Sequence, residues 1–81
     1  MTIIDVRSPE EYKSGYVENS KNIPLQEIKA HLKDIQSFEQ PIILCCASGN
    51  RSGQATIFLK NQGIECSNGG SWTDVQQKNS N

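Results

Sequence analysis

The sequence has little of what several functions depend on. Its 81 residues include only two arginines and one histidine, and the formal net charge is −1. Nucleic-acid-binding domains normally carry a basic face, so this charge balance argues against a nucleic-acid partner. There is no apolar run long enough to span a bilayer, and the amino terminus does not resemble a signal peptide. We therefore expect a soluble protein without a membrane partner, located in the cytoplasm, or in the periplasm if a leader has been removed.

Cysteine is also scarce, and its distribution is unsuited to a disulfide framework. The three cysteines are Cys45, Cys46 and Cys66. Their number is odd, and two adjacent cysteines bridge each other only through a strained ring. A single histidine, His31, and the lack of a Cys-x-x-Cys pair provide too few ligands for a zinc site. We expect no metal and no cofactor, and at least one thiol that is free to react.

The amino-terminal half alternates between strand and helix signals. Residues 2–6 are mostly β-branched and predict a short buried strand. The segment 8–11, Ser-Pro-Glu-Glu, has the form of a capping box and predicts the start of a brief helix that ends near Gly15. We expect Arg7 and Glu11 to form a structural pair or cap at this junction. A possible second strand at residues 21–23 closes at a proline.

The rest of the chain continues this alternation. One helical period places four apolar residues on a single face: Leu25, Ile28, Leu32 and Ile35. An apolar run at residues 42–45 predicts a central strand, and a helix is expected from Arg51 or Ser52 to Gly63. A last strand at residues 64–67, a turn at 68–70 and a helical turn capped by Ser71 complete the pattern.

This order indicates an α/β domain. Alternating strands and helices favour a parallel central sheet of four to five strands with helices on both faces, as three layers. We place this domain at residues 1–75 and expect a polar tail at residues 76–81. In such sheets ligands bind beyond the carboxyl ends of the strands, which is where the loop after Cys45 falls.

The segment from Cys46 to Ser52 has the composition of an anion-binding loop with a nucleophile. A thiol between a strand and a helix amino terminus faces backbone N–H groups, which favour the thiolate. Small residues permit a tight loop, and Gly49 can adopt a positive φ. Arg51 adds a planar cation that suits an oxyanion.

Spacing bears on the type of chemistry. Four residues separate Cys46 from Arg51, whereas five separate Cys45 from Arg51. The longer spacing is that of the cysteine phosphatases, whose loop encloses a tetrahedral phosphate. Cys45 continues the apolar strand and is expected to be buried, with a role as a resolving thiol left open. We therefore predict Cys46 as the nucleophile and Cys66 as a structural residue.

These motifs together resemble a known family. The segment 4–12, then Gly15, residues 22–24, the loop 46–52 and the Gly69-Gly70 pair before Trp72 are similar, in order, to the motifs of rhodanese domains. The similarity is greatest to the small single-domain rhodaneses of the phage-shock type. Larger members have a strand and a helix before the Asp-Val-Arg segment, so four strands are expected here where those members have five. Tyr16 stands where many members have histidine.

The resemblance implies a thiosulfate sulfurtransferase, an enzyme that carries sulfane sulfur as a cysteine persulfide. Cys46 falls on the persulfide-bearing position, and the substrate-binding loop comprises Ala47, Ser48, Gly49, Asn50, Arg51 and Ser52. The implied partners are a small anionic donor such as thiosulfate and an acceptor that is cyanide, a thiol or a protein persulfide relay. We expect a monomer. The alternatives left open are a non-catalytic or relay module that binds proteins and a small cysteine phosphatase or arsenate reductase.

Overall fold

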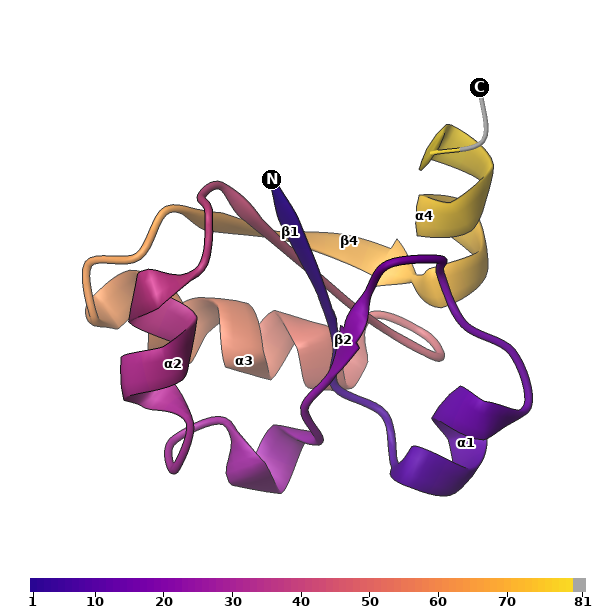
Figure 1. Ribbon diagram of the computed structural model, residues 1–81, viewed down its shortest axis with the longest axis horizontal. Helices are drawn as coiled ribbons and strands as arrows, with labels where there is room; N and C mark the ends of the chain where they lie inside the picture. The colour runs from indigo at the N-terminus through magenta and orange to yellow at the C-terminus, as the bar shows by residue number, and fades with distance from the viewer. Residues whose placement is uncertain (80–81) are drawn as a thin grey trace.

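The computed structural model describes residues 1–79, in which four parallel strands form one sheet. The elements in chain order are β1 (Thr2–Asp5), α1 (Pro9–Lys13), β2 (Lys21–Asn22), the 3-10 helix η1 (Leu25–Glu27), α2 (Leu32–Ser37), β3 (Ile42–Cys46), α3 (Asn50–Asn61), β4 (Cys66–Ser71) and α4 (Trp72–Asn79) (Figure 1). The strand order is β2-β1-β3-β4. This confirms the predicted α/β class with a four-stranded sheet.

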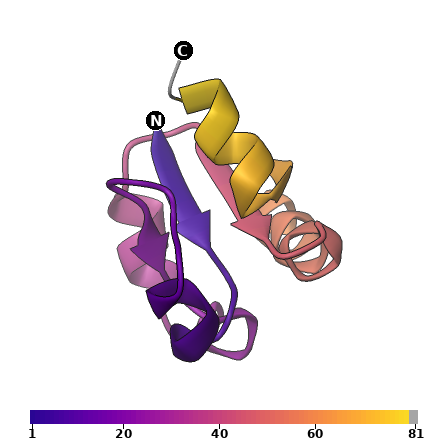
Figure 2. The ribbon, with the colours of Figure 1, turned by 90° about the vertical axis from the view of Figure 1, so that its right-hand side faces the viewer.

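Two apolar clusters cover the two faces of the sheet. The larger cluster joins Ile4 and Leu44 to Ile35 of α2 and Leu59 of α3. The smaller one joins strand residues to Val75 of α4. Helices α2 and α3 therefore lie on one face and α4 on the other, as the ribbon views show (Figures 1 and 2). The sheet is the middle of three layers.

The first helix starts as the sequence predicts. Ser8 is the N-cap of α1, its Oγ accepts from the Glu11 backbone N–H, and the Glu11 side chain accepts from the Ser8 N–H. Pro9 occupies the first helical position, where a missing N–H has no cost. The capping box thus fixes the position of the Glu11 carboxylate, which the candidate site uses.

The predicted helix through Leu25, Ile28, Leu32 and Ile35 is split. The chain forms η1, then a turn, and only then α2. The Ile28 N–H donates to the Leu25 carbonyl, a three-residue bond that tightens the first turn. Both Ile28 and Ile35 are nevertheless buried against the sheet. The two short helices η1 and α2 together bury the apolar residues of this pattern. Burial requires that these side chains face the sheet, and it does not require one continuous helix.

Strand β4 runs further than predicted. The expected turn at residues 68–70 lies within β4, which stays paired with β3 as far as Cys46 and Ser71. The register shifts between Leu44 and Cys45, so Gly69 is an extra residue in the ladder. A Cβ on Gly69 would lie 2.7 Å from Val75 and 2.9 Å from Ile43, which leaves room only for glycine.

The carboxyl-terminal segment is helical beyond residue 75. The sequence predicts a polar tail from residue 76, whereas α4 continues to Asn79. Ser71 caps this helix as expected, because its Oγ accepts from the Asp74 N–H at 3.1 Å. Residues 80–81 of the expected tail lie outside the described residues. Among the described helices, none is long and apolar enough to cross a membrane.

Candidate active site

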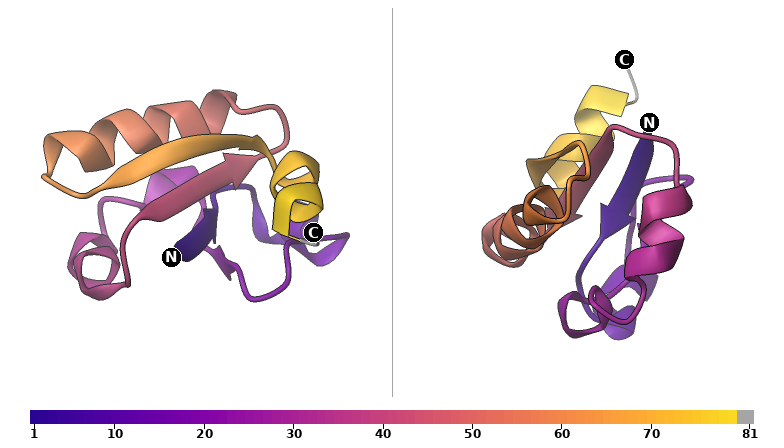
Figure 3. Two further views of the ribbon diagram at one scale, coloured as in Figure 1. Left: turned by 90° about the horizontal axis from the view of Figure 1, so that it is seen from above. Right: turned by 90° about the vertical axis from the view of Figure 1, so that its left-hand side faces the viewer.

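The two adjacent cysteines lie on opposite faces of β3. Cys46 belongs to the cluster under α2 and α3, and Cys45 belongs to the cluster under α4. Successive side chains of a strand alternate between faces, so adjacency in the chain separates the two thiols. Cys46 is the last residue of β3 and is followed by the loop to α3 at the carboxyl edge of the sheet (Figure 3).

Three groups from that loop and the first turn of α3 point hydrogens at the Cys46 sulfur. The Gly49 backbone N–H donates to Sγ at 3.0 Å, the Ser52 backbone N–H at 3.5 Å, and the Ser52 hydroxyl lies 3.4 Å from it. Gly49 is the N-cap of α3 with φ of +98°, a conformation that favours glycine. The left-handed turn directs the Gly49 N–H inward, toward the sulfur.

These donors change the acidity of the thiol. Burial opposes ionisation, but hydrogen bonds from the Ser52 side chain and backbone and from the backbones of Ser48 and Gly49 outweigh it. Together they lower the pKa of Cys46 to about 7. About half of the molecules therefore carry a thiolate at neutral pH. A thiolate is the nucleophilic form of cysteine, so the loop activates this residue without a general base.

The other two cysteines have no such loop. Burial, followed by the negative charge of Asp5, raises the pKa of Cys45 to about 12. Burial also raises the pKa of Cys66. The Cys66 thiol donates to the Thr56 carbonyl at 3.6 Å, and in β4 it pairs with Ile42, at the opposite end of β3 from Cys46. Both residues lie among apolar neighbours.

The Arg51 side chain is held by Glu11. The guanidinium makes two parallel bonds to the carboxylate, at 2.8 and 3.0 Å, across 40 residues of sequence. The bond from Arg51, followed by the Ser8 backbone, lowers the pKa of Glu11 to about 2. The pair is partly exposed. Helix α1 thus supplies the counter-ion for the cation of the loop.

The predicted pair between Arg7 and Glu11 does not form, whereas the predicted cap does, because Glu11 closes the capping box of α1. Arg7 instead binds Asp5 through Nε and Nη2, and its Nη2 also donates to the Gly15 carbonyl. The Asp5–Arg7 pair is almost fully buried, and the guanidinium stacks on Trp72 at 4.8 Å. Asp5 and Arg7 neutralise each other in the interior. The partly exposed Glu11 carboxylate binds Arg51, which lies 40 residues further along the chain. Trp72 itself is partly buried and packs against the smaller apolar cluster.

Ser52 and the loop residues differ in exposure. The sequence predicts a helix from Arg51 or Ser52, whereas α3 begins at Asn50 after the N-cap Gly49. Ser52 lies in the first turn and is buried, so its hydroxyl faces Cys46. Ala47, Ser48 and Asn50 are exposed, and Gly49 and Arg51 are half-buried. The outer residues of the loop are therefore exposed, whereas the Cys46 side chain beneath them is buried.

One contributor was not predicted. Asn68 of β4 accepts a hydrogen bond from the Ser52 hydroxyl at 2.7 Å and donates to the Gly49 carbonyl at 2.9 Å. The sequence indicates only a turn at this position, because an Asn-Gly pair is a common turn signal. Only the parallel pairing of β3 with β4 brings Asn68 to the loop.

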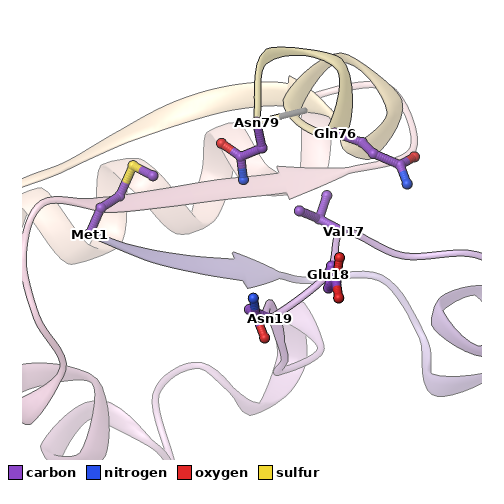
Figure 4. A pocket seen from close by; sticks show the side chains of 6 residues that line it. All are labelled: Met1, Val17, Glu18, Asn19, Gln76 and Asn79. Atoms are coloured by element: carbon purple, nitrogen blue, oxygen red, sulfur yellow. The ribbon is translucent and has the colours of Figure 1, made fainter. Parts of the chain in front are cut away.

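Other surface features lie away from the loop. A hollow on the Cys45 side is lined by polar and apolar residues that include no thiol: Met1, Val17, Glu18, Asn19, Gln76 and Asn79 (Figure 4). Within residues 1–79, no group of three or more His, Cys, Asp and Glu side chains is arranged to hold a metal ion.

Comparison with known proteins supplies a family. A family model described as rhodanese-like domain matches residues 1–78. Thiosulfate sulfurtransferase PspE of Escherichia coli is 34% identical over 74 residues, covering 89% of this chain and 71% of that protein. Thiosulfate sulfurtransferase GlpE of Pseudoalteromonas translucida is 35% identical over 65 residues, covering 80% of this chain and 61% of that protein. This chain thus spans less than two thirds of the GlpE relative.

Solved structures agree. A structure titled rhodanese with anions from E. coli superposes with a TM-score of 0.80 at 33% identity, covering 90% of this chain and 88% of that one. The shared fold therefore extends over most of both chains.

Proposed function

This chain belongs to the rhodanese-like sulfurtransferase family, and from that premise we propose that it is a thiosulfate sulfurtransferase whose sulfur is carried as a persulfide on Cys46. The observation that carries the proposal is the set of donors around Sγ, which lowers the pKa of this thiol to about 7. A free thiol without such donors would remain protonated and unreactive at neutral pH.

In the first half-reaction the Cys46 thiolate attacks the outer sulfur of thiosulfate. A bond forms between Sγ and that sulfur, the sulfur–sulfur bond of thiosulfate breaks, and sulfite leaves with the electron pair. The product is a Cys46 persulfide anion. No proton transfer is needed, because both the attacking sulfur and the leaving sulfite are anions.

The loop is suited to both the donor and the persulfide. We assign donor binding to Ala47, Ser48, Gly49, Asn50, Arg51 and Ser52, the residues that follow Cys46 in the loop and in the first turn of α3. Arg51 uses two nitrogens on Glu11 and has further N–H groups for a sulfonate oxygen. Backbone N–H groups stabilise the negative charge on the terminal sulfur in the manner of an oxyanion hole.

In the second half-reaction an acceptor removes the terminal sulfur. Cyanide attacks that sulfur, the Sγ–sulfur bond breaks, thiocyanate leaves and the Cys46 thiolate is restored. A thiolate acceptor takes the sulfur in the same way and becomes a persulfide itself. Both acceptors need access to the mouth of the loop, whose rim residues Ala47 and Ser48 are exposed.

Intact mass spectrometry of the reduced protein after incubation with thiosulfate tests the proposal. Wild type is expected to gain the mass of one sulfur atom and to lose it on addition of cyanide. Cys46→Ser is expected to gain none, which corresponds to loss of the nucleophile and at least a thousandfold drop in transfer rate.

Two matched variants complete that experiment. Cys45→Ser and Cys66→Ser make the same chemical change at the thiols outside the loop and should retain uptake. Sulfur uptake that persists in Cys46→Ser, or that disappears only in Cys45→Ser, contradicts the assignment. Absence of uptake in wild type together with hydrolysis of a phosphate ester would favour a phosphatase.

A further inference from the structure

The Asn68 side chain of β4 forms hydrogen bonds to two residues of the loop 46–52, Gly49 and Ser52. Its Oδ1 accepts from the Ser52 hydroxyl at 2.7 Å and from the Gly70 N–H at 3.0 Å, and its Nδ2 donates to the Gly49 carbonyl at 2.9 Å. The amide oxygen therefore binds Ser52, and the amide nitrogen binds Gly49. The bond to Gly70 fixes the plane of the amide relative to its own strand.

The residues that Asn68 holds are the same ones that donate to Cys46. Gly49 gives its N–H to Sγ at 3.0 Å, and Ser52 places its backbone N–H and hydroxyl at 3.5 and 3.4 Å. We propose that Asn68 is a positioning residue for sulfur transfer, which holds Gly49 by its carbonyl and Ser52 by its hydroxyl so that the Gly49 N–H and the Ser52 hydroxyl face the Cys46 sulfur. This inference rests on the proposed function of Cys46.

Gly53 leaves space for the Asn68 amide. A Cβ on Gly53 would lie 3.3 Å from Nδ2, which is closer than an ordinary contact. The register shift before Cys45 brings the asparagine to this place, since Asn68 still pairs with Leu44 while Gly70 pairs with Cys45. The bulge thus places Asn68, a strand residue, within hydrogen-bonding distance of Gly49 and Ser52.

The Ser52 hydroxyl has one hydrogen and two acceptors. Its Oγ is closer to Asn68 Oδ1 than to Cys46 Sγ, 2.7 against 3.4 Å. A neutral amide oxygen competes weakly with a thiolate for that hydrogen, because hydrogen bonds to charged acceptors are the stronger ones. Asn68 therefore holds the oxygen in place and gives up the hydrogen once the sulfur is ionised.

Replacing the amide by a carboxylate reverses this balance. In Asn68→Asp the side chain keeps its shape, but it holds the Ser52 hydrogen more strongly, cannot donate to the Gly49 carbonyl, and places a negative charge near the sulfur. Each change disfavours the thiolate. We expect the midpoint of Cys46 reactivity to rise by at least about one pH unit, which slows alkylation at pH 7 about fivefold.

The experiment measures the rate of iodoacetamide alkylation of Cys46 against pH, with the site identified by peptide mapping. The matched control is Asn61→Asp, the same chemical change at the far end of α3, about 16 Å along the helix from its first residue. At that distance the added charge is largely screened, so the control should keep the wild-type midpoint. Thermal unfolding checks that each variant is folded.

A second variant and a second background separate positioning from general effects. Asn68→Ala adds no charge and should raise the midpoint less than Asn68→Asp. In a Ser52→Ala background, where the shared hydroxyl is missing, the shift caused by Asn68→Asp should fall by at least half. Both results support the proposal.

Three outcomes would overturn it. These are an unchanged midpoint in folded Asn68→Asp, a shift that is undiminished in the Ser52→Ala background, and a loss of thermal stability without any change in the pH profile. Because alkylation needs no sulfur donor, the test is independent of turnover. If wild type took up no sulfur from thiosulfate but the midpoint moved as expected, the proposed function would fail and the positioning role of Asn68 would stand.

Discussion

Cys45 and Cys46 are neighbours in the chain and are both buried, but their pKa values are shifted in opposite directions. Neither thiol has any exposed surface. The pKa of Cys45 is raised to about 12, whereas that of Cys46 is lowered to about 7. Burial alone raises the pKa of a thiol, so it cannot account for both values. The difference comes from the two faces of β3.

On one face the sulfur meets apolar side chains and a carboxylate, and on the other it meets hydrogen-bond donors. Cys45 packs with Ile3, Val17 and Val75, near the Asp5 charge. Cys46 receives N–H groups from Gly49 and Ser52. The hydrogen-bond donors of the loop therefore account for the lower pKa of Cys46. Because side chains alternate along β3, only Cys46 faces these donors.

The largest expected effect is the difference in reactivity between these two thiols. At pH 8 about nine tenths of Cys46 is thiolate, against about one part in ten thousand of Cys45. Alkylation of Cys46 should rise with pH with a midpoint at about pH 7 and level off above about pH 8, because the rate follows the thiolate fraction. A thiolate of lower pKa is intrinsically the weaker nucleophile, which offsets part of this difference, so peptide mapping after timed labelling should show Cys46 modified about 100-fold faster at pH 8.

Labelling in denaturant is the control for that measurement. Both cysteines should react at similar rates once the chain is unfolded, since the loop and the apolar face are then lost. Comparable labelling of the two residues in the native protein would contradict the interpretation that the faces of β3 set their acidity.

The next effect concerns the stability of the Cys45 face. Asp5 and Arg7 form a nearly fully buried pair, with exposures of 0% and 4%. Asp5→Asn leaves the guanidinium without its charged partner and is expected to cost about 3–5 kcal/mol of unfolding free energy. Urea denaturation followed by circular dichroism measures the loss.

Glu10→Gln is the matched control for that variant, because Glu10 is an exposed residue of α1 and its loss of charge should change stability little. A loss of less than about 1 kcal/mol in Asp5→Asn would show that water or rearrangement compensates Arg7. The side of the sheet that carries Cys45 would then be more accessible to water than its packing indicates.

The smallest effect concerns the charge at the mouth of the Cys46 face. Glu11→Gln keeps a residue that can complete the capping box but removes the negative charge that offsets Arg51. An anionic donor should then bind more tightly. Under the proposed function, we expect the KM for thiosulfate to fall about two- to fivefold, in line with a partly exposed ion pair, with kcat nearly unchanged.

Steady-state assays with thiosulfate and cyanide measure this change, and Glu10→Gln again serves as the matched control because it removes the same charge from the same helix. A rise in KM would contradict the expectation. It would show that Glu11 is needed to orient Arg51 more than it competes with the donor.

Much of the fold was predictable because it depends on short-range patterns. The capping box at residues 8–11, the apolar run at 42–45 and the small residues of the loop were identified from the sequence and lie as expected. The helix boundaries were less accurate. The split between η1 and α2 and the extension of β4 through Gly70 depend on packing against the sheet, which local propensity does not encode.

The sequence by itself determined the family, the strand that ends in a thiol, and the glycine that turns the chain toward it. Tertiary structure alone decided two partners in the site: Glu11 for Arg51 and Asn68 for Ser52. The physical reason is that caps, strands and tight turns are set by interactions within a few residues. A side chain 16 or 40 residues away joins a site only when the sheet places it there.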